Sequence, residues 1–117
     1  MPLDTVSDLQ NALAIFANAR DWQQFHTPAN LAKAISCEAG ELLEQFLWNN
    51  DITWKNCPNL THEAISDEVA DVFIYLLRLC DVMGIDLITS TKAKIAKNAE
   101  KYPVDKCKGS ALKYDKL

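Results

Sequence analysis

Apolar residues recur along this chain about every three to four positions, the spacing of one face of an α-helix. Only 3 glycines and 4 prolines occur, which is few for a β-rich domain with many turns. The pattern predicts four helices, and the connections between them are short apart from a polar stretch near residue 54. Helices joined in this way are typical of an all-α four-helix bundle. The predicted helices span residues 4–19, 28–48, 61–83 and 86–101.

Residues typical of helix ends support these boundaries. Thr27 and Thr61 precede the second and third helices, and Asp86 precedes the fourth, where a side-chain oxygen can cap the first turn. Gly84 follows the third helix, as a C-terminal glycine commonly does. Beyond Pro103 the apolar content is low. We therefore expect a domain over residues 1–104 and a flexible basic C-terminal tail over 105–117.

Acidic residues lie on or beside the apolar faces of the second and third helices. The second helix carries Glu38 and Glu41, and the third carries Glu68 and Asp71. Each pair is spaced i, i+3, so its side chains are neighbours on one helix face. Glu41 precedes the connecting loop by about as much as Glu68 follows it, so the two pairs lie level in an antiparallel hairpin. We predict that the four carboxylates converge between the helices.

Four converging carboxylates repel one another and lose hydration unless a cation joins them. Mg²⁺ prefers oxygen ligands and commonly bridges to substrate phosphates, and Mn²⁺ is a possible substitute. A single acidic pair usually marks only a solvated helix face. Two matched pairs, level across a hairpin and beside apolar positions, favour the metal site instead. Glu44, Glu63 and Asp67 are interpreted as ordinary surface acids.

The charge of the chain is divided along its length. Residues 1–91 carry 4 basic and 13 acidic side chains, whereas residues 92–117 carry 8 basic and 3 acidic ones. The net charge of −4 argues against a protein that coats nucleic acid or an anionic membrane. It leaves room for a small polyanion bound through a metal ion.

Neither a targeting signal nor a membrane span is apparent. The N-terminus lacks the basic and then apolar layout of a signal peptide, and no apolar run approaches the length of a span. The four cysteines form no CxxC pair, so a structural zinc site has little support. Cys37 and Cys80 fall in apolar helical patterns and are predicted to be buried thiols. A reducing cytoplasm is the expected compartment.

The two acidic pairs, with 26 residues between them, resemble the motif of the all-α nucleoside triphosphate pyrophosphohydrolases, in their MazG-like branch. Within that branch the chain is similar to the dCTP pyrophosphatase subgroup over about residues 8–104. The resemblance is carried by the segments RDWQQFHTPANLAKAISCEAGELLEQFLW, DEVADVFIYLL and KIAKNAEKYPV. It implies an enzyme that hydrolyses a nucleoside triphosphate between the α and β phosphates.

The resemblance also implies roles for individual residues. The four carboxylates match the family's Mg²⁺ ligands. Glu38 or Glu41 is the expected residue to orient or deprotonate the attacking water. Phosphate contacts are implied for Lys94 and Asn98 and, less directly, for Lys101 and Tyr102. A pocket for a pyrimidine base is implied for Trp22, His26, Trp48 and Tyr75. Family members assemble as dimers or tetramers whose sites share residues between subunits.

Alternatives to each part of this interpretation remain open. Helical aromatics such as Trp48 and Tyr75 are more often core residues than ligand contacts. These two lie on opposite sides of the carboxylates in an antiparallel hairpin, so they share one base only if the nucleotide bends or another chain contributes. Trp22 and His26 could instead fix the first connector, and Trp54 is interpreted as a loop anchor. The whole protein could be a non-catalytic nucleotide-binding module, or an enzyme for dUTP or oxidised purine nucleotides.

Overall fold

The computed structural model describes residues 2–49 and 60–117. Every regular element in these ranges is helical, which confirms the predicted all-α class. The predicted loop anchor Trp54 and the cysteine Cys57 lie outside the described residues. The helices are α1 (Val6–Ala19), η1 (Gln23–Phe25), α2 (Pro28–Glu44), α3 (His62–Met83), α4 (Leu87–Lys101), α5 (Val104–Cys107) and η3 (Tyr114–Lys116).

The chain divides into two compact units, Met1–Gly84 and Ile85–Leu117. The first unit contains α1, α2 and α3, and the second contains α4 and the C-terminal segments. The four-helix bundle and the domain boundary after residue 104 stay predictions, because each unit is described by itself. In the described part of the chain, no helix has the length and apolar character needed to cross a bilayer.

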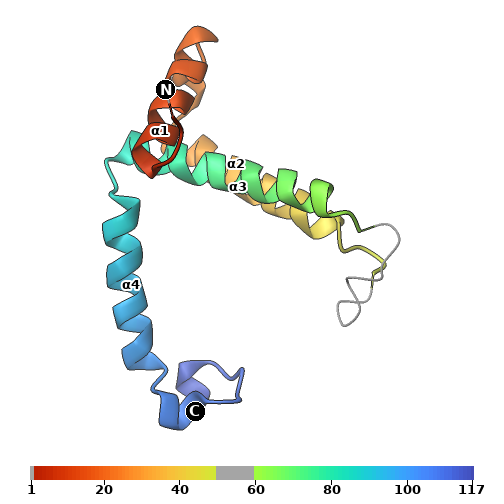
Figure 1. Ribbon diagram of the computed structural model, residues 1–117, viewed down its shortest axis with the longest axis vertical. Helices are drawn as coiled ribbons and strands as arrows, with labels where there is room; N and C mark the ends of the chain where they lie inside the picture. The colour runs from red at the N-terminus through yellow and green to blue at the C-terminus, as the bar shows by residue number, and fades with distance from the viewer. Residues whose placement is uncertain (1, 50–59) are drawn as a thin grey trace. The chain divides into compact units, whose positions relative to one another are not determined.

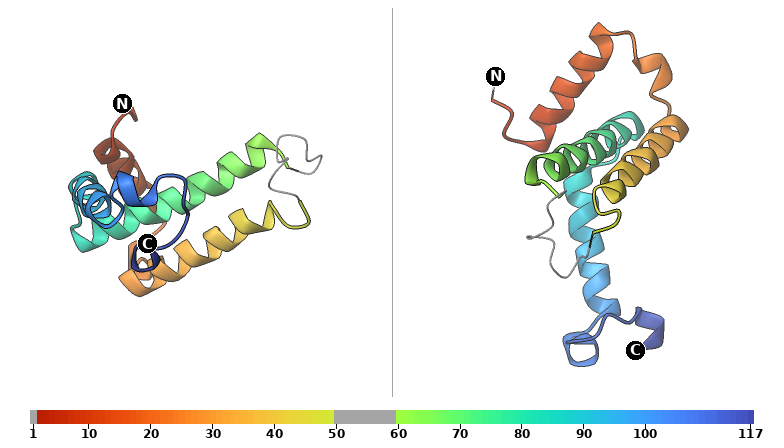
Figure 2. Two further views of the ribbon diagram at one scale, coloured as in Figure 1. Left: turned by 90° about the horizontal axis from the view of Figure 1, so that it is seen from below. Right: turned by 90° about the vertical axis from the view of Figure 1, so that its right-hand side faces the viewer.

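Helices α2 and α3 lie side by side and antiparallel in the first unit (Figures 1 and 2). Their contact buries Leu31 of α2 and Leu77 of α3, each with 1% of its surface exposed. Helix α1 packs on α3, where Ala17 is buried and the Gln10 amide donates a hydrogen bond of 3.2 Å to the Leu77 carbonyl. These contacts hold the α1–α2 connector next to the C-terminal half of α3.

The predicted helix-capping residues occupy their expected positions. The hydroxyls of Thr27 and Thr61 accept hydrogen bonds from the backbone of Asn30 and Ala64, at 3.2 and 3.1 Å. Asp86 accepts from the Thr89 amide in the same way, at 3.0 Å. Gly84 ends α3 with a positive φ of 69°, the left-handed conformation that glycine adopts without steric strain.

Two expectations for the second helix were wrong. Helix α2 ends at Glu44 rather than at Trp48, because the backbone tightens into successive i→i+3 hydrogen bonds, beginning with Gln45 N–H to Leu42 O. Trp48 then adopts a positive φ of 66°, a conformation that is incompatible with a right-handed helix. Cys37 is exposed rather than buried, because helical spacing places it on a different face of α2 from the buried Leu31. Cys80 is buried as predicted.

The C-terminal segment folds against the end of α4 in the second unit. The Tyr114 backbone N–H donates a hydrogen bond of 3.3 Å to the Tyr102 hydroxyl, and the two rings meet edge to face. The Lys101 ammonium lies 4.8 Å from the centre of the Tyr114 ring, within the range of a cation–π contact. The segment predicted as a tail therefore includes all but the first residue of the short helix α5, and the helical turn η3. Its flexibility stays a prediction.

Candidate active site

Four carboxylates from α2 and α3 converge at the middle of the hairpin. One oxygen each from Glu38, Glu41, Glu68 and Asp71 lies within 4.8 Å of all the others. We call this set the carboxylate cluster. The i, i+3 spacing places each pair on one face of its helix, and the antiparallel register brings the two faces level, as the sequence argument expects.

Burial and mutual repulsion disfavour the charged form of the carboxylates in the cluster. Burial, a hydrogen bond shared with Glu41 and the charges of the other three carboxylates raise the pKa of Glu38 to about 7. Burial and then the charge of Glu41 also raise the pKa of Glu68. Among the described residues, no hydrogen-bond partner reaches the buried Oε2 atoms of Glu38 and Glu68. A buried carboxylate oxygen normally has such a partner, so these two are available to a ligand.

The cluster fits a hard divalent cation. All of its donors are carboxylate oxygens, which Mg²⁺ and Mn²⁺ prefer over nitrogen or sulfur. Two of these oxygens are buried and, among the described residues, have no hydrogen-bond partner. A bound cation would stabilise their negative charge, which the neighbouring carboxylates repel. The residues present therefore fit the metal that the sequence predicts.

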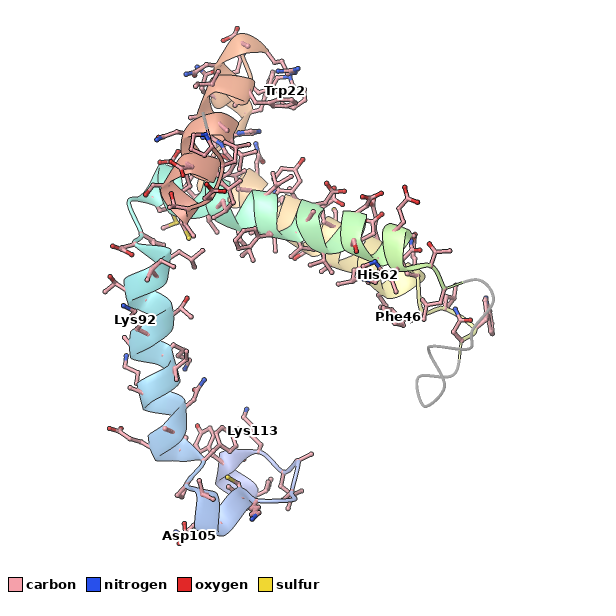
Figure 3. All side chains as sticks on the ribbon, in the orientation of Figure 1. Trp22, Phe46, His62, Lys92, Asp105 and Lys113 are labelled. Carbon is pink, nitrogen blue, oxygen red and sulfur yellow. The ribbon has the colours of Figure 1, made fainter. Side chains whose placement is uncertain are left out.

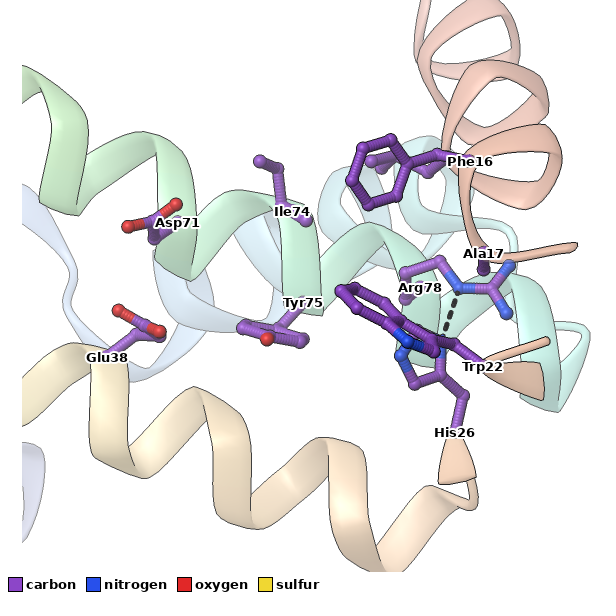
Figure 4. A pocket seen from close by; sticks show the side chains of 10 residues that line it. Phe16, Ala17, Trp22, His26, Glu38, Asp71, Ile74, Tyr75 and Arg78 are labelled. Atoms are coloured by element: carbon purple, nitrogen blue, oxygen red, sulfur yellow. Dashed lines mark hydrogen bonds between the residues drawn. The ribbon is translucent and has the colours of Figure 1, made fainter. Parts of the chain in front are cut away.

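A pocket of about 260 Å³ adjoins the cluster. This volume lies just below the usual range of small-ligand sites, so the pocket is suited to part of a nucleotide rather than all of it. We call it the aromatic pocket, and Figure 4 shows most of its lining. It is lined by Leu13, Phe16, Ala17, Trp22, His26, Glu38, Asp71, Ile74, Tyr75 and Arg78.

Three rings stack edge to face along one side of the aromatic pocket. The Trp22 ring lies 5.7 Å from that of Phe16 and 6.3 Å from that of His26, measured between centres. Tyr75 of α3 lies between these rings and the carboxylates (Figure 4). Burial, followed by the charge of Glu38, raises the pKa of the Tyr75 hydroxyl, which is consistent with its place beside the cluster. Rings of this kind offer flat apolar faces on which a base can stack.

A buried arginine joins the pocket to the first connector. Arg78 of α3 has only 6% of its surface exposed. Its Nε–H donates a hydrogen bond of 3.2 Å to Nδ1 of His26, and Nη1 lies 3.3 Å from a carboxylate oxygen of Asp81. Burial, and then the charge of Arg78, lower the pKa of His26 below 6.5. The imidazole is therefore neutral at physiological pH.

The structure brings together three of the four predicted base-binding residues. Trp22, His26 and Tyr75 line the aromatic pocket, whereas Trp48 does not. Trp48 is 94% exposed and follows Phe46 at the far end of the hairpin from Trp22 (Figure 3). Its predicted place on the face of the carboxylates depended on a helix that reached residue 48. A role for Trp48 in base binding stays a prediction for an assembled form.

The four predicted phosphate-binding residues lie in the second unit. Lys94 and Asn98 face the same shallow groove along α4, together with Ser90, Thr91 and Ile95. Lys101 and Tyr102 lie at the end of α4, where both contact Tyr114. Their phosphate contacts stay predictions, because the two units are described separately.

Sequence reasoning missed two contributors to the aromatic pocket. Helical periodicity places Phe16 only among the apolar positions of the first helix, and it assigns no partner to Arg78 in the third helix. Phe16 is 46% exposed, an exposure that helical periodicity does not reveal. Arg78 carried a usable signal, because a charged residue inside the apolar run of the third helix has to find a polar partner when it is buried.

The model of the MazG-like family matches residues 33–117. The chain belongs to the MazG-like family. This MazG-like chain is 39% identical to dCTP pyrophosphatase 1 of Mus musculus and 36% identical to that of Homo sapiens. Each match covers 99% of the chain and 69% of the relative. The crystal structure of a pyrophosphatase from Archaeoglobus fulgidus is similar, with a TM-score of 0.76 and 42% identity over 83% of this chain and 91% of that one.

Proposed function

We propose that this MazG-like protein is a Mg²⁺-dependent nucleoside triphosphate pyrophosphohydrolase that prefers dCTP or a modified dCTP. Its products would be the monophosphate and pyrophosphate. One observation carries the proposal: Glu38 and Asp71 belong both to the aromatic pocket and to the carboxylate cluster. A ligand with a ring at one end and a metal-bound polyanion next to it fits this arrangement. The names of the relatives support the same substrate and reaction.

The proposed metal ligands are Glu38, Glu41, Glu68 and Asp71, with Mn²⁺ able to replace Mg²⁺. A divalent cation supplies charge neutralisation of the phosphates and polarises the bond under attack. The protein holds four carboxylates at one point, so one that is not fully occupied as a ligand can orient water and accept its proton. We assign this role to Glu38 or Glu41. Direct attack by water is preferred, since no serine, threonine, cysteine or lysine lies among the residues that line the described pocket.

For the base, Trp22 and Tyr75 supply ring faces and His26 a polar atom, all in one pocket. For the phosphates, Lys94 and Asn98 share a face of α4, so both can approach one anionic group. Lys101 and Tyr102 are weaker candidates, because both already contact the C-terminal segment.

A homodimer or homotetramer with shared sites is the proposed assembly. Large apolar side chains are exposed in the first unit, including Leu43 at 72% and Val69 at 50%. Val69 lines an apolar groove on α3 with Ile65, Ala70 and Phe73, bordered by His62 and Ser66. Contiguous exposed apolar surface commonly marks a protein interface. A reducing cytoplasm is the proposed compartment, on the sequence argument given above.

The test is product analysis on a panel of nucleotides with Mg²⁺: dCTP, 5-methyl-dCTP, dUTP and 8-oxo-dGTP. We expect dCMP and pyrophosphate from dCTP, and no reaction when the metal is chelated. The Glu68→Gln variant should lose about a hundredfold or more in kcat, the size of effect seen when one charge-stabilising group is removed. Glu44→Gln, a substitution of an exposed acid on the same hairpin outside the cluster, should retain the wild-type rate.

Three outcomes would favour other functions. Tight nucleotide binding without turnover would favour a non-catalytic binding module. Faster turnover of dUTP or 8-oxo-dGTP than of dCTP would favour a different substrate class for the same reaction. Release of inorganic phosphate instead of pyrophosphate would contradict the proposed position of cleavage.

A further inference from the structure

The hydrogen bond between Arg78 and His26 determines which imidazole nitrogen carries the proton. A guanidinium donates hydrogen bonds and cannot accept them. The Nδ1 atom that receives the Arg78 Nε–H, at 3.2 Å, must therefore present its lone pair. A neutral imidazole with a free lone pair on Nδ1 carries its proton on Nε2.

Arg78 is itself held firmly in this position. It is almost fully buried on α3, and its second contact, to the Asp81 carboxylate, restrains the other end of the guanidinium. His26 belongs to the connector before α2, so the bond also joins two elements that are 52 residues apart. The planar guanidinium presents its donors in fixed directions, which a flexible ammonium does not.

The remaining polar atom of the imidazole is the Nε2–H. His26 lines the aromatic pocket beside the Trp22 ring. Tyr75 lines the same pocket between these two rings and the carboxylates of Glu38 and Asp71 (Figure 4). The pocket walls that face it from α1 are apolar: Leu13, Phe16 and Ala17. A ligand that fills the pocket covers this donor, and it binds best when it brings an acceptor, because a donor left without a partner under the ligand is costly.

We propose that Arg78 is a positioning residue that fixes His26 as the neutral Nε2–H tautomer, so that the pocket offers a hydrogen-bond donor to an acceptor on the ring of the bound base. The ligand part of this inference rests on the proposed function. Cytosine has such acceptors in its ring nitrogen N3 and its carbonyl O2. In the other tautomer a lone pair would face these acceptors and repel them.

The first experiment observes the tautomer directly and needs no substrate. The chain has 2 histidines, so long-range ¹H–¹⁵N spectra of histidine-labelled protein are simple, and a His62→Gln variant assigns them. Wild-type His26 should show the pattern of the Nε2–H tautomer. Arg78→Met, which has similar length and no donor, should give a mixture of tautomers. Asp81→Asn leaves the Nε donor in place and is the matched control, expected to keep the wild-type pattern.

The second experiment measures kcat and KM for dCTP. Loss of one hydrogen bond to the base should raise KM about tenfold in Arg78→Met with little change in kcat, because His26 contacts the base and not the reacting phosphate. Arg78→Lys restores a positive donor and should recover part of the loss. It also replaces Arg78→Met in both experiments if thermal melting shows that the methionine variant is unfolded, and it should then give a tautomer mixture and an intermediate KM.

The outcomes separate this inference from the proposed function. A wild-type Nδ1–H tautomer, or an unchanged tautomer when Arg78 is replaced, would overturn the role of Arg78 whatever the enzyme does. A changed tautomer with an unchanged KM for dCTP would overturn the role of His26 as donor to the base. If the wild-type protein hydrolyses no nucleotide, the proposed function and the base contact fail together, and the spectra still decide the pairing of Arg78 with His26.

Discussion

Glu38 of α2 and Asp71 of α3 each belong to two adjoining features, the carboxylate cluster and the aromatic pocket. They face one another across the hairpin, with Tyr75 between them and the Trp22 ring (Figure 4). A nucleotide that stacks its base on the rings therefore brings its phosphates toward the proposed metal ligands. The base does not react, but the free energy of its binding can in this way position the phosphate bond that is to be cleaved.

The repulsion within the carboxylate cluster predicts how the protein responds to metal. Above pH 7, where Glu38 is mostly ionised despite its raised pKa, Glu38→Gln removes one of four converging negative charges, so it should raise the melting temperature of the metal-free protein. Metal removal should lower the melting temperature of the wild type, and added Mg²⁺ should restore it by binding the folded state. In the variant this response to Mg²⁺ should be largely lost. Differential scanning calorimetry with and without a chelator measures both effects.

The control for this prediction is Glu44→Gln, which changes the net charge equally and leaves the cluster intact. It should retain the wild-type response to Mg²⁺. An equal response to Mg²⁺ in Glu38→Gln and in the wild type would show that the cation binds elsewhere.

Because the pKa of His26 is lowered in the folded protein, we predict that the free energy of unfolding falls as the pH falls. An unfolded chain takes up this proton near pH 6.5, whereas the folded protein resists it until lower pH, because burial and Arg78 disfavour the charged ring. The stability that His26 contributes is therefore complete above about pH 6.5 and is lost as the pH falls through that value toward the lowered pKa. The charged groups facing the pocket are Arg78, Glu38 and Asp71.

Urea unfolding of the wild type and of His26→Gln across this pH range is the measurement. The free energy of unfolding of the wild type should fall more steeply on acidification than that of the variant. Parallel profiles would contradict a lowered pKa of His26 in the folded protein.

The carboxylate cluster could be predicted from the sequence because it depends on local spacing and on one symmetric hairpin. Glu38 and Glu41 share a helix face because of their spacing, whatever surrounds them. Glu68 lies opposite Glu41 because the two residues are about equally far from the connecting loop. The end of α2 could not be predicted in this way, since residues 45–48 continue an acceptable helical pattern. The i→i+3 hydrogen bonds after Glu44 end the α-helix, so Trp48 does not lie on the helix face of Glu38 and Glu41 that the periodicity predicts.

The pairing of Arg78 with His26 lay beyond the sequence for a different reason. It joins α3 to a connector 52 residues earlier, and its geometry depends on how α1 directs that connector across the hairpin. Periodicity describes the faces of one helix and carries no information on such crossings. The burial of a charged residue in the third helix is visible in the sequence, but the identity of its partner is not.

The edge-to-face rings predict the contribution of Trp22 to substrate binding. Trp22→Leu keeps an apolar side chain and removes the ring that contacts both Phe16 and His26. Stacking of a base on an aromatic side chain contributes about 1–3 kcal/mol, so KM for dCTP should rise about tenfold or more with a smaller change in kcat. Steady-state kinetics measure this split. Trp48→Leu, which leaves the aromatic pocket unaltered, is the informative comparison, and a larger effect on KM there would locate the base at the other end of the hairpin.

The apolar groove on α3 predicts that assembly and activity are linked. Val69 is half exposed between Ile65 and Phe73, so Val69→Glu places a charge where the proposed interface would bury it. Sedimentation should show a shift toward smaller species, and the specific activity should fall on dilution more than that of the wild type if subunits share sites. Asn11→Glu adds the same charge on an exposed position of α1 outside the groove and should change neither property. A wild-type protein that sediments as a monomer and is fully active would refute the shared-site assembly, and the pocket and carboxylates of one chain would then suffice for the reaction.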